Sequence, residues 1–316
     1  MDQEIRERLD AQAGVIARHQ LRELGARPCD LERMVRRRDL SPVYRGVFVN
    51  HTGELSWAQL AWAAVLAVWP AALWGPTALR AHRDHRVRAA GESVEDGTLH
   101  VAVEHGRRLV APTGVTLHRV RRLDDQVRWN LGPPRQHVEQ AVLDAAGCAT
   151  TRTGRIGVIT AVANAGASTA ERIRRALDAR SRIRDREWWR GVLTDLAEGT
   201  NSVLEHAYLV NVERAHGLPA GRRQARVVTE RGVTYRDVDY DGLVVELDGH
   251  AFHNSAVDRT RDLARDLRTA VAGVRTVRLS YGQVFDDPCG VAASIAAILH
   301  APVRPCGPRC AVPRSA

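Results

Sequence analysis

The stretch from Tyr235 to His253 is where this sequence forces several carboxylates together. An Asp-Gly pair, Asp241-Gly242, lies between two β-prone runs, and such a pair is a strong signal for a two-residue hairpin turn. The residue numbers of cross-strand partners in such a hairpin have a constant sum, so the register follows from the turn. Asp237 is therefore expected directly opposite Glu246.

Four acids of this hairpin are expected to share one face, because side chains alternate between the two faces of a strand. They are Asp237, Asp239, Glu246 and Asp248. Like charges placed opposite one another destabilise a sheet. A divalent cation held by hard carboxylate oxygens would offset the repulsion, and we expect Mg²⁺, with Mn²⁺ as an alternative. Arginine partners, or a solvated acidic sheet edge, would also account for the acids.

Two residues outside the paired strands are further candidates for the same site. Glu205 lies near the start of a helix expected from residue 200 to about residue 216. It is either a third acid beside the hairpin or the partner of Ser202 in a capping box. His253 follows the hairpin by one short loop and could polarise a water or contact a phosphate, although a lone histidine is more often structural.

The composition favours a polyanionic partner. The 316-residue chain has a formal net charge of +9, and its 46 basic residues are all arginines. Arginine binds phosphate and guanine in a bidentate manner, so DNA is the expected partner. No apolar run is long enough to cross a bilayer and the N-terminus lacks a signal layout, which favours a cytoplasmic protein without a membrane partner.

The first 50 residues indicate a small helical unit that ends in a β-hairpin. Helices are expected at 2–12, 16–24 and about 30–38, and an alternating strand at 43–49 bends at Gly46. This is the spacing of a winged helix-turn-helix, whose third helix enters a DNA groove. The arginines expected to contact DNA are Arg33, Arg36, Arg37, Arg38 and Arg45. The alternative is an ordinary helical domain with a solvated basic face.

Three segments in this region carry a resemblance to a known family. They are residues 13–25, Val43 to Phe48, and His51 to Gly53. Over about the first 80 residues the chain resembles the winged-helix domain of the abortive-infection type IV antitoxin (AbiEi-like) family. The resemblance implies a DNA-binding module associated with autoregulation, and a cognate toxin protein is a further partner to consider.

Residues 81–190 are expected to form a small α/β region with connecting helices, and the end of this range is expected to be a surface linker. Alternating runs at 99–103 and 115–120 predict a small antiparallel sheet. His100 and His118 are expected near each other on it, without the ligand spacing of a metal site. An alanine-rich helix at 57–73 is expected to bury its tryptophans in the core.

Residues 191–300 predict a compact α/β domain with a mixed sheet. After the first helix come a strand at 224–228, the hairpin, a helix at 257–271, a strand at 275–279 and a helix near 291–299, which is the order of a restriction-endonuclease-like core. The helix at 257–271 carries Arg261 and Arg265 on one stripe. These arginines either follow a DNA backbone or pair with acids of the same helix.

Several segments of this region carry a second resemblance: Ser202 to Glu205, His216 to Pro219, Gln224, Tyr235 to Val238, Val244 to Gly249, His253, and Arg261 to Asp266. They resemble the Vsr-like (very-short-patch-repair endonuclease-like) domain of unknown function. The resemblance implies a metal-dependent nuclease fold with Asp237 as the metal-binding aspartate and Glu246 as the first acid of its motif. The third position is Asp248 rather than lysine, so Asp248 is expected as a further ligand or acid.

The five cysteines are scattered and odd in number, which fits a reducing compartment. Cys306 and Cys310 lie in a proline-rich segment, 301–316, that is expected to be a flexible tail. Zinc requires four ligands, so a zinc site there would need Cys289 and His300 as well.

We therefore expect an α+β protein with a winged-helix domain at 1–80, a middle region at 81–190, a nuclease-like domain at 191–300 and a tail. The leading hypothesis is a DNA-binding protein with a metal-dependent endonuclease domain. The alternative is an antitoxin or transcriptional regulator whose nuclease-like domain has lost catalysis.

Overall fold

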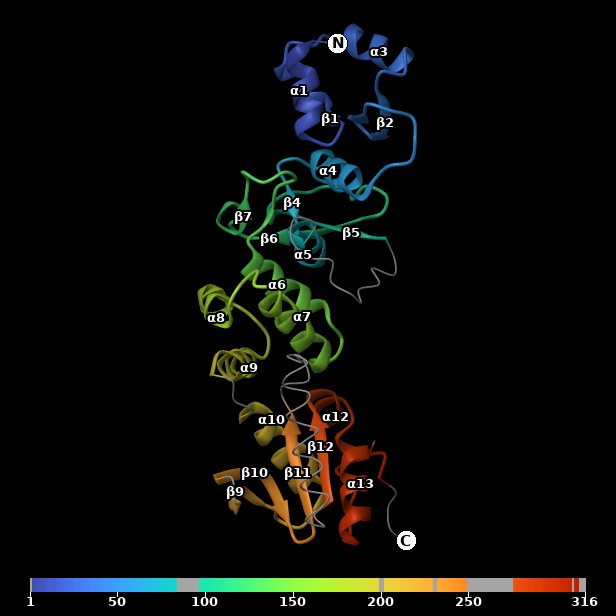
Figure 1. Cartoon of the computed structure of the whole chain (residues 1–316). Helices are drawn as coiled ribbons and strands as arrows, with labels where there is room; N and C mark the ends of the chain where they lie inside the picture. The colour runs from blue at the N-terminus through green and yellow to red at the C-terminus, as the bar shows by residue number, and fades with distance from the viewer. Residues whose placement is uncertain are drawn as a thin grey trace. The chain divides into compact units, whose positions relative to one another are not determined.

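The computed structural model describes residues 2–83, 97–198, 202–229, 232–248, 275–308 and 310–312. They form an α+β protein with mixed sheets, as the sequence predicted (Figure 1). The chain divides into two compact units, Met1–Ala145 and Ala146–Ala316. The domain boundaries expected near residues 80 and 190 lie inside these units.

The N-terminal part of the first unit has three helices and a three-stranded sheet with the strand order β1-β3-β2. Its elements are α1 (Gln3–Ala11), β1 (Val15–Ala17), α2 (Arg18–Glu23), α3 (Pro28–Arg36), β2 (Ser41–Tyr44) and β3 (Val47–Val49). The helix expected at 16–24 begins later, because β1 first pairs with β3. Apolar side chains from the helices and the sheet form the core: Ile5, Leu9, Ile16, Leu21, Met34, Leu40 and Phe48.

The rest of the first unit is built on a five-stranded sheet with the order β6-β5-β4-β8-β7. Its elements are α4 (Trp57–Ala67), β4 (Ala72–Leu73), α5 (Gly75–Arg83), β5 (Leu99–Glu104), β6 (Val115–Val120), the 3-10 helix η1 (Leu123–Gln126), β7 (Val127–Arg128) and β8 (Arg135–Gln136). The helix α6 (Val138–Cys148) follows and leads into the second unit.

Two expectations for this region were wrong. Strands β5 and β6 pair in parallel, because the connection 105–114 returns the chain to the same end of the sheet and Arg107 anchors it to the carbonyls of Val68 and Trp69. The helix α4 ends at Ala67, and Trp69 beyond it is 40% exposed. The buried face of the helix is formed by small residues instead of the tryptophans. Ala63, for example, packs against the β1–β3 strand pair.

The second unit begins with helices and continues into a mixed sheet. Its helices are α7 (Arg152–Asn164), α8 (Ala170–Ala179), α9 (Arg186–Glu198), α10 (Ser202–Ala207), the π-helix η2 (Tyr208–Arg214), α12 (Tyr281–Asp286) and α13 (Pro288–Leu299). Its strands are β9 (Arg222–Thr229), β10 (Gly232–Tyr240), β11 (Leu243–Asp248) and β12 (Arg275–Ser280). Part of the expected surface linker at 181–190 belongs to α9.

The sheet has the order β12-β11-β10-β9, with β11 and β12 parallel and the other pairs antiparallel, so the mixed sheet is confirmed. The predicted hairpin register is confirmed from Tyr240–Leu243 to Val238–Val245. The pairing stops before Asp237, whose carboxylate Oδ2 itself accepts the N–H of Leu247 at 2.7 Å. This carboxylate therefore takes the place of a backbone acceptor at the edge of the ladder.

The helix expected at 257–271 lies outside the described residues, and so do His253, Arg261 and Arg265. Among the helices that the structure describes, none is long and apolar enough to cross a membrane.

Candidate functional site

Two acids from different elements meet at one side-chain amide in the second unit. The Gln224 Nε2 of β9 donates to Glu205 Oε1 of α10 at 2.9 Å and lies 3.4 Å from Asp237 Oδ1 of β10. The structure thus places Glu205 beside the hairpin. Within the described residues its carboxylate is engaged by Gln224 and not by a capping box.

The backbone of Gln224 is unusual for a strand residue. Its φ of 47° lies in the left-handed region, which costs a residue other than glycine about 1–3 kcal/mol. The ladder between β9 and β10 omits the Gln224–Asp237 pair, although the pairs on either side are formed. A residue held in a strained conformation between two acids is a feature that clusters at functional sites.

The electrostatics of this group disfavour two full negative charges. Burial, followed by the charge of Asp237, raises the pKa of the Glu205 carboxyl above its ordinary value, and the bond from Gln224 acts in the opposite direction. Neither Glu205 nor Asp237 forms an ion pair within the part of the chain that the structure describes. A cation bound between them would lower the repulsion.

The other predicted ligands lie one strand away. Glu246 and Asp248 are half-buried on β11, on either side of Leu247, whose N–H fixes the Asp237 carboxylate. In the parallel register with β12, Glu246 lies beside Arg278. The neighbourhood of Glu246 therefore includes an arginine as well as the acids.

Asp239 has a different role from Asp237, although the two are only two residues apart. It is 6% exposed, and its carboxylate pairs with Arg222 at 2.6 Å and Arg236 at 3.1 Å. The alternative in which arginines offset the acids therefore holds for Asp239. It leaves Asp237 as the upstream acid that has no such partner among the described residues.

A buried hydrogen-bond network holds the helix that carries Glu205 against the sheet. Glu213 of η2 is 4% exposed, accepts from Tyr240 Oη at 2.7 Å and from Gly221 N–H at 3.2 Å, and forms an ion pair with Arg223 at 2.9 Å. Tyr208 Oη lies 2.9 Å from Tyr240 Oη, and burial raises the pKa of Tyr208 to about 12.

Sequence reasoning missed this network. The signal was the five-residue spacing of Tyr208 and Glu213, which share a face in a π-helix but not in an α-helix. The network positions Glu205 indirectly, because α10 runs directly into η2.

A second cluster in the same unit has different donors. The ligand atoms of His216, Cys289, Cys306 and Cys310 all lie within 4.8 Å of one another. Among the described residues, these four are the group of three or more potential metal ligands whose ligand atoms lie this close together. The predicted set Asp237, Glu246 and Asp248 does not form such a group.

The sequence favoured a flexible tail here and named Cys289 and His300 as the further ligands that a zinc site would need. His300 is the C-cap of α13, while Cys289 lies in the first turn of that helix. The length of the helix therefore separates the two residues. His216 takes the place of His300.

His100 and His118 lie near each other, as predicted. His100 Nδ1 is 2.9 Å from His118 Nε2, and the His118 ring stacks on Trp74 with a centroid distance of 3.5 Å. Burial lowers the pKa of His118 to about 4, so the imidazole stays neutral near neutral pH. This pair is part of the packing of the first unit.

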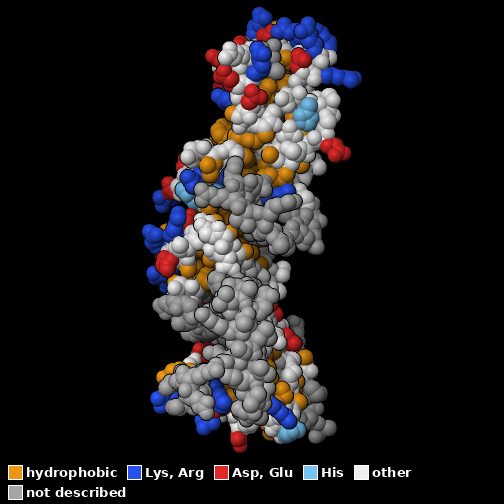
Figure 2. Space-filling model, viewed as in Figure 1, with side chains coloured by type: hydrophobic (Ala, Val, Ile, Leu, Met, Phe, Trp, Pro, Cys, Tyr) orange, Lys and Arg blue, Asp and Glu red, His pale blue; other side chains and the backbone are white. Residues whose placement is uncertain are grey.

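The predicted DNA-contacting arginines are exposed on and beyond α3 and in the β2–β3 turn. Arg33 pairs with Asp30 at 2.9 Å, and the bond from Arg27 lowers the pKa of that aspartate. The remaining four form no ion pair with any described residue: Arg36, Arg37, Arg38 and Arg45. Figure 2 shows basic side chains gathered over α3 and the neighbouring part of the N-terminal unit.

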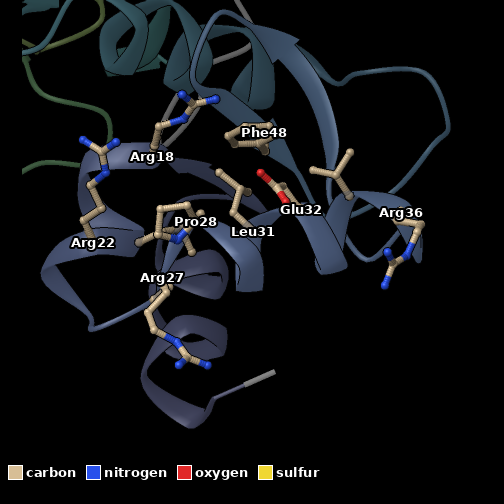
Figure 3. A pocket seen from close by; sticks show the side chains of 11 residues that line it. Arg18, Arg22, Arg27, Pro28, Leu31, Glu32, Arg36 and Phe48 are labelled. Atoms are coloured by element: carbon tan, nitrogen blue, oxygen red, sulfur yellow. The ribbon is translucent and has the colours of Figure 1, made fainter.

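A hollow of about 440 Å³ lies beside α3, between that helix, α2 and β3. Apolar side chains line its middle, as Figure 3 shows for Pro28, Leu31 and Phe48. Its surroundings are basic, with side chains from Arg18, Arg22, Arg27 and Arg36. The arginine-rich surface is therefore wider than α3 alone.

No protein-family model matches this chain, and no curated protein is significantly similar to it. The resemblances to the AbiEi-like and Vsr-like families therefore stay predictions.

Proposed function

We propose that this protein binds DNA through its N-terminal unit and hydrolyses a phosphodiester bond at the carboxylate site of its second unit. The observation that carries the proposal is the meeting of Glu205 and Asp237 at Gln224, without an ion-pair partner for either acid among the described residues. Action on DNA implies a cytoplasmic location.

The DNA-binding half is supported by topology and charge. We infer a winged helix-turn-helix from the element order α1-β1-α2-α3-β2-β3 and the sheet order β1-β3-β2. In that arrangement α3 is the helix that enters the groove. Four exposed arginines without acid partners in the described residues are then available to phosphates.

The donor set of the carboxylate site fits a hard divalent cation. Carboxylate oxygens are the ligands that Mg²⁺ and Mn²⁺ prefer, so Asp237 would hold the ion, and Glu246 and Asp248 on the neighbouring strand are further candidates. Burial is the main cause of the raised pKa of Glu205, and the negative charge of Asp237, which a cation would offset, is the second. When bound, such an ion lowers the pKa of a coordinated water.

The residues of the chain have distinct roles in this proposal. Asp237 is held in place by the N–H of Leu247 and the amide of Gln224, so it acts as the fixed ligand. Glu205 is the proposed proton acceptor. Burial and the charge of Asp237 raise its pKa toward neutral pH, and a general base is most effective when its pKa is near the working pH. The chain contains no lysine, and arginine stays protonated, so neither can take that part.

The test is incubation of the purified protein with supercoiled plasmid and Mg²⁺ or Mn²⁺. Wild-type protein is expected to nick the plasmid, and Asp237→Ala is expected to abolish nicking. The matched control is Asp241→Asn, an exposed acid in the turn of the same hairpin, which is expected to keep full activity. Absence of cleavage by wild-type protein with either metal would sink the enzymatic half of the proposal.

A second candidate is a DNA-binding regulator or antitoxin without catalysis. It is favoured by two observations: the acids Asp237, Glu246 and Asp248 do not gather as closely as the cysteines, and Arg278 lies beside Glu246. Salt-sensitive binding of the DNA upstream of its own gene, without cleavage, would select this candidate. A cognate toxin protein would then be a partner to test.

A further inference from the structure

The cysteine–histidine cluster has the spacing of a tetrahedral metal site. Cys310 Sγ lies 3.5 Å from both Cys289 Sγ and His216 Nε2, and Cys289 Sγ lies 3.7 Å from Cys306 Sγ. Tetrahedral zinc, with Zn–S of about 2.3 Å and Zn–N of about 2.0 Å, separates two sulfurs by about 3.8 Å and a sulfur from a nitrogen by about 3.6 Å. The spacings in this protein agree with both values.

His216 is oriented as a ligand. Its side chain is fully buried, and its Nδ1 lies 3.0 Å from the carbonyl oxygen of Val212, one turn earlier in the helix. A neutral imidazole that donates from Nδ1 presents the lone pair of Nε2, and here Nε2 faces Cys310. Metal-binding histidines commonly have their other ring N–H fixed by a carbonyl in this way.

The chain around the cluster brings the other ligands to His216. Arg304 N–H donates to the carbonyl of His216 at 2.9 Å, which lays the C-terminal segment along the end of η2. Gly217 has a φ of +66°, and a Cβ there would lie 2.8 Å from Arg304 Nε. Glycine adopts this left-handed conformation without strain, and it also leaves room for the Arg304 side chain.

The three cysteines are held by ordinary local structure. Cys289 lies in the first turn of α13, and Asp287 caps that helix through Gly290 N–H at 2.9 Å. Cys306 and Cys310 flank a turn closed by the Cys310 N–H and the Gly307 carbonyl at 3.2 Å. Three residues between them is within the usual spacing of paired zinc ligands.

We propose that His216, Cys289, Cys306 and Cys310 bind one zinc ion. Soft thiolates with one imidazole select zinc over Mg²⁺, and all three thiol protons leave when the metal binds. Four protein ligands close the coordination sphere, so the ion has a structural role. A disulfide is the competing use of these cysteines, but it would engage two sulfurs and leave the third, together with the oriented His216, without a function.

Zinc would fasten the C-terminal segment to the start of α13 and the end of η2. The sequence predicted a flexible tail at residues 301–316. In the described residues 301–308 and 310–312, Arg304 and Cys310 instead contact His216, and Val312 is buried. This inference does not depend on DNA binding or on cleavage. A protein with no nuclease activity would have the same site.

The direct test is the zinc content of the full-length protein, purified with a thiol reductant and without chelator. Mass spectrometry of the metal is expected to find about one zinc per chain, and Cys306→Ser/Cys310→Ser is expected to reduce it at least about tenfold. The matched control is Cys29→Ser/Cys148→Ser, which removes the two exposed cysteines outside the cluster and is expected to keep full zinc content. Wild-type protein without zinc, or equal zinc in both double variants, would overturn the proposal.

A second measurement on wild-type protein covers the case in which the cluster variant does not fold. Protein purified without reductant is denatured with a chelator, and its thiols are counted with a chromogenic disulfide. All five cysteines are expected to react after denaturation, and Cys29 and Cys148 to react first in the native protein. A total of three thiols would show a disulfide, and that result contradicts the zinc site.

Discussion

The second unit has two candidate metal sites at the two ends of one helical segment. Glu205 lies in α10 at its start and His216 directly after η2 at its end, so the sites are roughly 15 Å apart along the helix. At the His216 end the donors are soft, close together and complete in number. At the Glu205 end they are hard, spread over three elements and bridged by an amide.

This difference is informative about function. The cysteine–histidine site has the features of a structural metal site, because its donors are gathered and its histidine is oriented by the carbonyl of Val212. The carboxylate site keeps features that cost stability, namely the left-handed Gln224 and two acids without an ion pair in the described residues. Natural proteins retain such destabilising features mainly at functional sites.

The largest difference between the two sites is expected on metal removal. Stripping zinc with a mercurial reagent and chelator should lower the melting temperature of the second unit by roughly 10 °C or more, since structural zinc contributes folding free energy. Removing only Mg²⁺ should stop plasmid cleavage and leave the melting temperature nearly unchanged. Calorimetry on the same samples measures the two melting temperatures, and the plasmid assay measures cleavage. An identical thermal profile with and without zinc would contradict a structural role of the cysteine–histidine site.

Glu205→Gln should separate activity from stability. Cleavage is expected to fall about 100-fold or more, as for loss of a general base, while the amide keeps the bond from Gln224. The folded-state pKa of Glu205 is raised, so wild-type protein loses stability as pH rises from the unfolded value, about 4.3, through the folded value.

The variant has no carboxyl to ionise at that position. It should therefore be more stable than wild type at neutral pH and equally stable below about pH 4. Denaturant unfolding at the two pH values checks this sign. A Glu205→Gln protein that is less stable at neutral pH would indicate a structural acid.

Asp239→Asn should lower stability and leave cleavage nearly unchanged, which is the opposite of Glu205→Gln. This carboxylate pairs with Arg222 and Arg236 and is buried, so its loss is expected to destabilise the unit by about 1–3 kcal/mol. Plasmid cleavage under conditions where the variant is folded should stay within about threefold of wild type. Equal losses of cleavage in Asp239→Asn and Asp237→Asn would mean that the two acids are not distinct.

The smallest effect on stability is expected from Gln224→Gly. Glycine adopts the left-handed conformation without strain, so stability should rise by about 1 kcal/mol, while loss of the bridging amide should lower cleavage about tenfold. Gln126→Gly, at a glutamine of the first unit, is the control for a general effect of the substitution. A Gln224→Gly protein with reduced stability would remove the case for stored strain.

The parts of the fold that local pattern determines could be predicted from the sequence. The Asp241-Gly242 turn fixes the hairpin register, because a two-residue turn leaves one pairing of the flanking strands. The strand β12 and the helix α13 were predicted within three residues of their observed bounds, since apolar periodicity and flanking residues mark them. For Glu205 the sequence left two alternatives open, a third acid beside the hairpin and a capping-box partner of Ser202.

Features set by tertiary contacts could not be predicted in this way. Alternation identifies β5 and β6 but carries no information on their relative direction, which depends on the path of residues 105–114. The choice of His216 over His300 depends on which ends of two helices meet, and cysteine spacing does not contain that information. The left-handed Gln224 is a glutamine in a β-prone run, and its sequence context gives no sign of strain.

Binding of Mn²⁺ to the zinc-loaded protein, followed by electron paramagnetic resonance, tests the proposed carboxylate site most directly. Zinc occupies the cysteine–histidine cluster, so bound Mn²⁺ reports on the acids alone. We expect about one Mn²⁺ per chain in wild-type protein and in Asp239→Asn, and at least about a tenfold weaker affinity in Asp237→Ala. Absence of Mn²⁺ binding at millimolar concentration, or binding that Asp237→Ala leaves unchanged, would contradict a metal site at Asp237.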